Sequence, residues 1–238
     1  MRRLIPYIAS DYRKDRIWMR RTKKAQRDYQ SGLISGSHCS GRLRKYEREW
    51  DSPGRPLMVT CESVCIVEDA LRRCDAGGVA VCSFGSDVKV INAFGDHMMP
   101  GPELLQKLSF NQSSTDLLLL LNRSRQMLRD VRTPTSEQLL IIISDGRGAL
   151  AQGAEKVKAA LAALQGVTVL FVILDSGPKS ICELSVASFQ GENVVLTPYL
   201  SSFPFPFYAI VKAVTQLPST LAESIRQWFE MTVQTNSI

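Results

Sequence analysis

From residue 57 onward, the hydrophobic positions of this chain alternate between continuous apolar runs and segments with helical spacing. The runs are rich in Val, Ile and Leu, which is typical of strands buried on both faces of a parallel sheet. They cover residues 79–84, 139–144 and 167–174. Residues 117–131 and 153–164 carry apolar side chains at the spacing of amphipathic helices. This order predicts an α/β fold of three layers, a doubly wound and mostly parallel sheet with helices on both faces.

Shorter segments predict the outer elements of the same fold. Gly77-Gly78 ends a helix expected over residues 57–74, because glycine readily adopts the left-handed conformation that terminates helices. The other expected elements are a short strand over 88–91, a short helix over 181–189, an edge strand over 192–196, an apolar run over 208–214 and a terminal helix starting near Pro218.

Basic residues are concentrated at the start of the chain. Residues 1–30 contain ten Lys or Arg and three Asp, so they account for the net charge of +6, and the remainder is close to neutral. Such a segment could contact RNA, an acidic partner or an import receptor, or it could be a solvated flank, and charge alone does not separate these. We expect four parts: a basic N-terminal extension over 1–30, an atypical flexible insert over 31–55, a domain over 56–232 and a tail over 233–238.

Composition argues against a membrane protein and against a zinc protein. The longest apolar runs fall far short of the roughly 20 residues that span a bilayer, so we expect no membrane contact. The six cysteines include no Cys-x-x-Cys pair and are accompanied by only two histidines. We therefore expect reduced, buried thiols and no zinc site.

One strand ends in a motif that points to a site. The run over 139–144 stops at Asp145, which is followed by Gly146 and Arg147. In open α/β sheets, ligands and ions bind where the carboxyl ends of the strands meet, so Asp145 is expected at such a rim. Thr115 stands just before the helix at 117–131, where it is either a helix cap or a second polar group of the same rim.

Several segments together resemble a known family. In sequence letters they are LIPYIAS at 4–10, KDRIWMRRTK at 14–23, GVAVCSFG at 78–85, LIIISDGRG at 140–148, FPFPFY at 203–208 and RQWF at 226–229. These segments resemble von Willebrand factor A-type domains. More narrowly, they resemble the C-terminal A-type domain of the midasin family, giant AAA-type ATPases of large-ribosomal-subunit assembly.

This resemblance implies a metal site with one part missing. A-type domains hold Mg²⁺ with an Asp-x-Ser-x-Ser loop after the first strand, a threonine from a second loop and an aspartate from a third. Thr115 and Asp145 match the second and third loops, whereas Asp-x-Ser-x-Ser occurs nowhere in the sequence. We therefore expect the insert over 31–55 to replace the metal loop, the central first strand to be degraded and Mg²⁺ to have an incomplete set of ligands.

The resemblance also implies a function. It predicts a non-catalytic interaction module that docks the ubiquitin-like domain of an assembly factor on the pre-60S particle, in the nucleolus and nucleoplasm of the nucleus. Gly146 and Arg147, beside the metal position, are expected to contact that partner, and metal-dependent docking is expected to be impaired. The family's ATPase activity is carried by regions absent from this chain.

Two other functions stay open on the residues alone. One is a nucleotide-dependent enzyme on a doubly wound sheet, although the sequence has no Gly-x-Gly-x-x-Gly, P-loop or Gly-x-Ser-x-Gly motif. The other is an RNA-binding module that uses the basic residues of 1–30, which would bind RNA with a steep dependence on salt.

Overall fold

The computed structural model describes residues 3–10, 60, 62–67, 71, 78–97, 103, 107, 114–134, 136–175, 179–190 and 193–235. A six-stranded sheet forms its centre, with the strand order β3-β2-β1-β4-β5-β8. The strands are β1 (Arg3–Ser10), β2 (Ala80–Phe84), β3 (Val88–Asn92), β4 (Ser136–Ser144), β5 (Val167–Leu174) and β8 (Tyr208–Val211). Neighbouring strands run parallel, except that β3 is antiparallel to β2.

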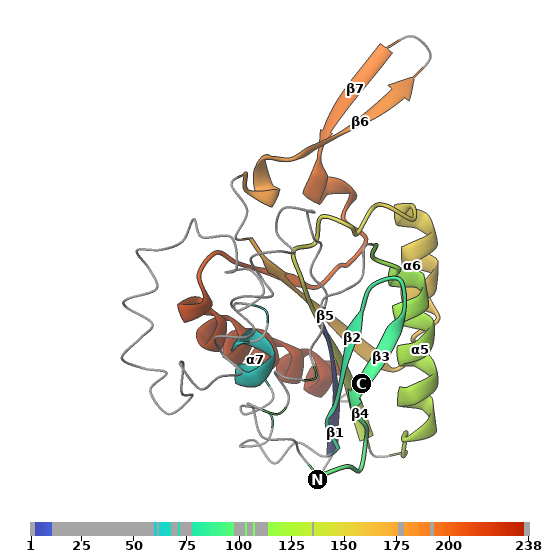
Figure 1. Ribbon diagram of the computed structural model, residues 1–238, viewed down its shortest axis with the longest axis vertical. Coiled ribbons are helices and arrows are strands. Elements are labelled where there is room, and N and C mark those ends of the chain that lie inside the picture. Colours follow the sequence, from blue (N-terminus) through green and yellow to red (C-terminus); the bar gives the residue numbers. More distant parts are fainter. Residues whose placement is uncertain are drawn as a thin grey trace.

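Helices cover both faces of this sheet (Figure 1). Two of them, α5 (Leu117–Asp130) and α6 (Ala154–Ala162), lie on one face, and α7 (Leu217–Thr235) lies on the other. Residues 62–67 are also helical and share a hydrophobic cluster with Trp228 of α7. In the described part of the chain, no helix combines the length and apolarity needed to cross a membrane. The three-layer α/β fold predicted from the sequence is confirmed.

The side chains of β4 alternate between two hydrophobic cores. Leu139, Ile141 and Ile143 belong to the cluster on the α7 face, whereas Leu140 and Ile142 belong to the cluster beneath α5 and α6. Both sets are almost completely buried, which explains why this strand reads as a continuous apolar run. Each such side chain contributes about 1.5–3 kcal/mol on burial, so β4 is a major source of stability.

The centre of the sheet is β1, because this strand pairs with β2 on one side and with β4 on the other. Tyr7 is in register with Ala80 of β2 and with Leu140 of β4. The division of the sequence into a basic extension and a domain is therefore corrected, since residues 3–10 belong to the sheet. Pairing with β2 begins at Tyr7, so Pro6, which has no N–H to donate, precedes the doubly paired part of the strand.

Several predictions lie outside the described residues. These are the RNA contact of the rest of the basic segment and the insert over 31–55 that was expected to replace the metal loop. Of the tail expected over 233–238, residues 233–235 belong to α7 and residues 236–238 lie outside the described part. The insert was also expected to leave the central strand position degraded. In the structure that position is occupied by residues 3–10.

A hairpin projects from the body of the domain (Figure 1). It consists of β6 (Ser185–Gln190) and β7 (Asn193–Pro198), which pair with each other in a separate antiparallel sheet. The helix expected over 181–189 is therefore wrong beyond one 3₁₀ turn at Ile181–Glu183, and the expected edge strand does not join the main sheet. The segment 185–190 takes its conformation from its cross-strand partner, which a local helical spacing does not reveal.

The cysteines fit the expectation of buried thiols only in part. Cys82 is fully buried in β2, within the core beneath α5. Cys65 is half-buried, and Cys182 is exposed in the 3₁₀ turn before β6. The other three cysteines lie outside the described residues. Within the described part of the chain, no three His, Cys, Asp or Glu side chains cluster closely enough to hold a metal ion.

Candidate functional site

The rim of the sheet carries a tight turn directly after β4. Gly146 has a φ of 70°, in the left-handed region that only glycine adopts without strain. Its N–H donates to Ser144 Oγ over 3.2 Å, and the N–H of Arg147 donates to Asp145 Oδ1 over 3.0 Å. A β-carbon at Gly146 would lie 3.1 Å from Ile181 Cδ1. The turn thus needs glycine both for its backbone angle and for space.

The carbonyl of Gly146 accepts two further hydrogen bonds. The hydroxyl of Tyr199 donates to it over 2.7 Å, and the N–H of Ala149 donates to it over 3.1 Å. Tyr199 is buried at the far end of the hairpin segment, and its own N–H donates to the carbonyl of Leu184 over 2.8 Å. The turn after β4 is therefore held by a side chain that lies 53 residues further along the chain.

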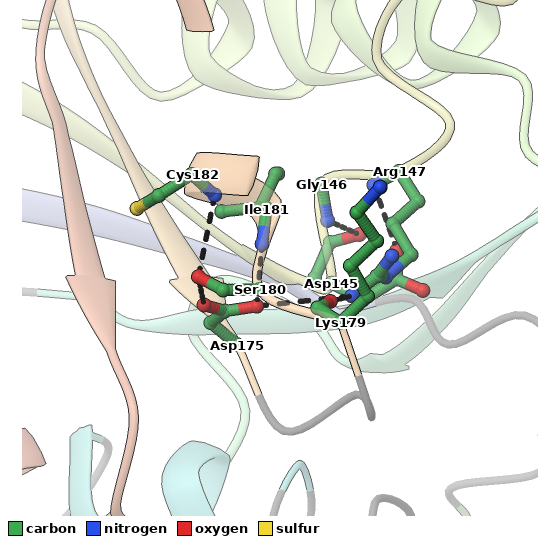
Figure 2. Close-up of polar contacts among 9 residues, drawn as sticks. Asp145, Gly146, Arg147, Asp175, Lys179, Ser180, Ile181 and Cys182 are labelled. Atoms are coloured by element: carbon green, nitrogen blue, oxygen red, sulfur yellow. Dashed lines mark hydrogen bonds and ion pairs between the residues drawn. The ribbon is translucent and has the colours of Figure 1, made fainter. Parts of the chain in front are cut away.

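A second carboxylate, Asp175, lies directly after β5 and is largely enclosed. Its side chain is 2% exposed and accepts from the Ser180 hydroxyl over 2.5 Å and from the Ile181 N–H over 2.9 Å. The guanidinium of Arg147 stands 3.8 Å from Asp175 Oδ1 and also donates to the carbonyl of Lys179 (Figure 2). Asp175 therefore connects the β5 end to Arg147.

The loop before α5 is tied to the loop after β4. Asp116 is the N-cap of α5, because its Oδ1 accepts from the N–H of Leu119 over 2.8 Å. The same oxygen accepts from Gln152 Nε2 over 2.7 Å, while Gln152 Oε1 accepts from the N–H of Leu118 over 3.1 Å. The N–H of Asp116 donates to the carbonyl of Gly85, just after β2. These bonds join the loops that follow β2 and β4.

Thr115 and Asp145, predicted as site residues, both lie on loops of this rim. Thr115 is buried, and the N-cap of α5 is its neighbour Asp116, so of the two roles expected for Thr115 the helix cap is wrong. Asp145 is half-buried and receives the N–H of Arg147. Arg147, predicted to contact a partner, makes its described contacts with Asp175 and Lys179 and keeps 29% of its side chain exposed.

Sequence reasoning missed three residues that shape this rim. Asp175 was not among the predicted site residues, yet it accepts two hydrogen bonds and forms an ion pair with Arg147. Gln152 and Tyr199 were not singled out, because their partners lie 36 and 53 residues away in the chain. No local sequence pattern marks such contacts.

The described residues do not make a complete magnesium site. Mg²⁺ requires about six oxygen ligands in near-octahedral geometry. Thr115 and Asp145 offer a hydroxyl and a carboxylate, but Asp175 is already engaged by Ser180, Ile181 and Arg147. The donor set in the described part of the chain therefore accounts for only part of a coordination shell.

Two solved structures have a fold similar to that of this chain. One is proximal thread matrix protein 1 from the mussel byssus with a zinc-occupied MIDAS motif, at a TM-score of 0.52 and 12% identity, covering 94% of this chain and 47% of that one. Another is manganese-loaded TRAP protein of Plasmodium vivax, at a TM-score of 0.51 and 13% identity, covering 94% and 73%. The chain has the fold of a von Willebrand factor A-type domain.

In sequence, the chain is similar to midasin along its whole length. It is 31% identical to midasin of Dictyostelium discoideum over 99% of this chain and 28% identical to midasin of Giardia intestinalis over 100% of it. The chain spans only 4% and 5% of the length of these relatives. No family model matches it. The predicted resemblance to midasin is confirmed, and a midasin-type A domain fits a protein-interaction module, a class that is generally non-catalytic.

Proposed function

We propose that this chain is a non-catalytic docking domain that binds a protein partner at the docking rim, defined here as residues 115–116 and 145–147. The partner is the ubiquitin-like domain of an assembly factor of the large ribosomal subunit, bound on the pre-60S particle in the nucleolus and nucleoplasm. The similarity to midasin over the whole chain supports this assignment.

The observation that carries the proposal is the pre-organisation of the docking rim. Asp145 is held by the N–H of Arg147, the Arg147 guanidinium is held beside Asp175, and Asp116 is held by Gln152. A rim that is already ordered loses little conformational freedom when a partner binds, which favours affinity. The partly exposed guanidinium of Arg147 suits a carboxylate on the partner, because charge-assisted hydrogen bonds of this kind are strong and directional.

A divalent cation is a secondary part of the proposal. The two solved proteins of similar fold named above contain zinc and manganese, which supports the proposal of a cation at Thr115 and Asp145 here. A divalent ion at that position would bridge the domain to a partner carboxylate. Because the described residues supply only part of its shell, we expect weak ion binding and docking that depends little on Mg²⁺.

Titration of the chain with a purified ubiquitin-like domain of an assembly factor tests the proposal. Calorimetry in Mg²⁺ and in EDTA is expected to give saturable binding in both buffers, with less than about a tenfold difference in Kd. Asp145→Ala is expected to weaken binding, whereas Asp130→Ala, at the exposed end of α5, is expected to leave it unchanged. Absence of binding, or equal affinity for the wild type and Asp145→Ala, would overturn the proposal.

A further inference from the structure

The segment between β5 and β8 holds the turn after β4 from two sides. At its start, Lys179 accepts from Arg147, and Ser180 and Ile181 donate to Asp175. At its end, Tyr199 donates to the carbonyl of Gly146. The two ends are joined where the N–H of Tyr199 donates to the carbonyl of Leu184. Residues 179–184 and 199–202, on either side of the hairpin, therefore form a clamp on the docking rim.

The bond from Tyr199 acts on one peptide plane of the turn. The Gly146 carbonyl and the Arg147 N–H belong to the same peptide group, which is rigid and planar. The carbonyl side of this plane accepts from Tyr199 over 2.7 Å, and the N–H side donates to Asp145 Oδ1 over 3.0 Å. Rotation of the plane would break both bonds at once. The hydroxyl of Tyr199 thereby fixes the donor that orients the Asp145 carboxylate.

The left-handed conformation of Gly146 makes this restraint necessary. Glycine populates many backbone angles almost equally, so a φ of 70° is not fixed by the residue itself. The N–H of Ala149, over 3.1 Å, and the longer bond from Gly146 to Ser144 restrain the turn only from within. Tyr199 supplies a restraint from outside the turn, and its ring is held by Phe203, with the ring centroids 6.3 Å apart.

We propose that Tyr199 is a positioning residue of the docking rim, which holds the Gly146–Arg147 peptide so that Asp145 is presented to the partner. The importance of Asp145 for docking rests on the proposed function above, whereas the effect of Tyr199 on the turn does not. Movement of the hairpin β6–β7, which leads directly into Tyr199, would consequently change the docking rim.

Hydrogen exchange followed by NMR tests the positioning without any partner. In Tyr199→Phe, which removes only the hydroxyl, the amide of Arg147 is expected to exchange faster by about three- to tenfold, the ratio that one net hydrogen bond is worth. The amides of Ile141 and Ile142, in the middle of β4, should keep their wild-type rates. Equal acceleration of these core amides would assign Tyr199 a merely structural role and overturn the proposal, as would an unchanged Arg147 rate.

The matched control is Tyr208→Phe. Tyr208 also packs on Phe203, with ring centroids 5.2 Å apart, but it lies on the edge strand β8. This variant is expected to leave the Arg147 amide at its wild-type rate. If it accelerates Arg147 as much as Tyr199→Phe does, the effect comes from the aromatic cluster and the proposal fails.

Measuring the Kd for the ubiquitin-like domain distinguishes failure of the positioning role of Tyr199 from failure of the proposed docking function. If the wild type binds, Tyr199→Phe is expected to raise the Kd by about three- to tenfold, whereas Tyr208→Phe is not. A wild type that fails to bind, combined with faster Arg147 exchange in Tyr199→Phe, would refute the docking function and support the positioning role. Binding by the wild type with no change of Kd or exchange in Tyr199→Phe would refute the positioning role alone.

Discussion

Gln152 Nε2 donates to Asp116 Oδ1 over 2.7 Å, so the loop after β4 is fastened to the N-cap of α5. The same amide group also accepts from the N–H of Leu118, one of the N-terminal donors that an α-helix leaves without an intrahelical partner. Gln152 therefore acts as a second capping residue contributed by another element.

This relationship predicts coupling between Gln152 and Asp116. Each single alanine substitution is expected to lower the free energy of unfolding by about 1–2 kcal/mol, because it removes capping bonds of α5. The double variant should cost less than the sum of the two, since both remove the shared bond. Urea denaturation measures all three. Gln126→Ala, on the exposed face of α5, is the control, and strict additivity would contradict the coupling.

Substituting Gly146 and Gly153 by alanine separates two costs, the strain of the backbone conformation and the crowding of the added methyl group. Both have positive φ angles, 70° and 88°, but a β-carbon would lie 3.1 Å from Ile181 Cδ1 at Gly146 and would have nothing within 4 Å at Gly153. Gly153→Ala is expected to cost about 1–3 kcal/mol from strain alone, because its φ of 88° and ψ of 126° lie in a region that alanine rarely adopts. Gly146→Ala adds crowding against Ile181 to its own strain, and combination with Ile181→Val should recover the part that is due to crowding.

Thermal or urea unfolding of these variants measures the difference. Ile181→Val by itself provides the baseline, since deleting one buried methyl group costs about 0.5–1.5 kcal/mol. If Ile181→Val recovers none of the loss caused by Gly146→Ala, the turn shifts enough to accommodate a methyl group next to Ile181.

The central position of β1 predicts a strong response to proline. Ile8 is in register with Val81 and with Ile141, so its backbone lies between two strands. Ile8→Pro removes a ladder donor and is expected to cost at least about 1–3 kcal/mol, since a buried acceptor loses its partner. Ile8→Val keeps the N–H and is the control. A similar, small loss for both variants in urea denaturation would argue against a central β1.

Glu223 predicts a small dependence of stability on acid. Hydrogen bonds from Arg226, over 2.6 and 3.0 Å, and then from Gln227 hold the pKa of this carboxyl below its usual value. Because the pKa of Glu223 is lower in the folded state than in the unfolded chain, the ionised carboxyl stabilises the fold at pH values above the unfolded pKa. This contribution is lost as the pH falls through the folded pKa. The pair is exposed on α7, so the effect is small.

The difference in unfolding free energy between the wild type and Glu223→Gln, measured across pH, tests this sign. It should favour the wild type at neutral pH and shrink as the pH falls below about 4.3, the ordinary value for glutamate. A difference that grows toward acid would contradict the assignment.

The buried strands β2, β4 and β5 could be predicted from the sequence. The central strand β1 and the pairing of β6 with β7 could not. The run over 139–144 marks β4 because both faces of that strand meet hydrophobic cores. Residues 3–10 contain Pro6 and adjoin a basic segment, features that argue locally against a central strand. Their place is decided by pairing with β2 and β4, which is tertiary information.

Some residues of the candidate site could likewise be placed from the sequence, and others could not. The positions of Asp145 after a strand and of Thr115 before a helix could be predicted, because a strand end and a helix start have recognisable sequence signals, whereas their role as ligands stays a prediction. The parts that fix these residues, Gln152 and Tyr199, act on distant segments through single side-chain bonds. A local reading cannot distinguish a glutamine that bonds another loop from one that is solvated.

The pairing of β1 also sets the order in which this domain is able to fold on the ribosome. The strand is made first, but its partner residues in β2 and β4 are translated much later, with Tyr7 meeting Leu140 across more than half of the chain. Contacts between residues so distant in sequence slow folding. A nascent chain that stops short of β4 holds an unmatched strand, a species prone to aggregate. The central strand of the sheet can therefore be paired on both sides only after β4 has been synthesised.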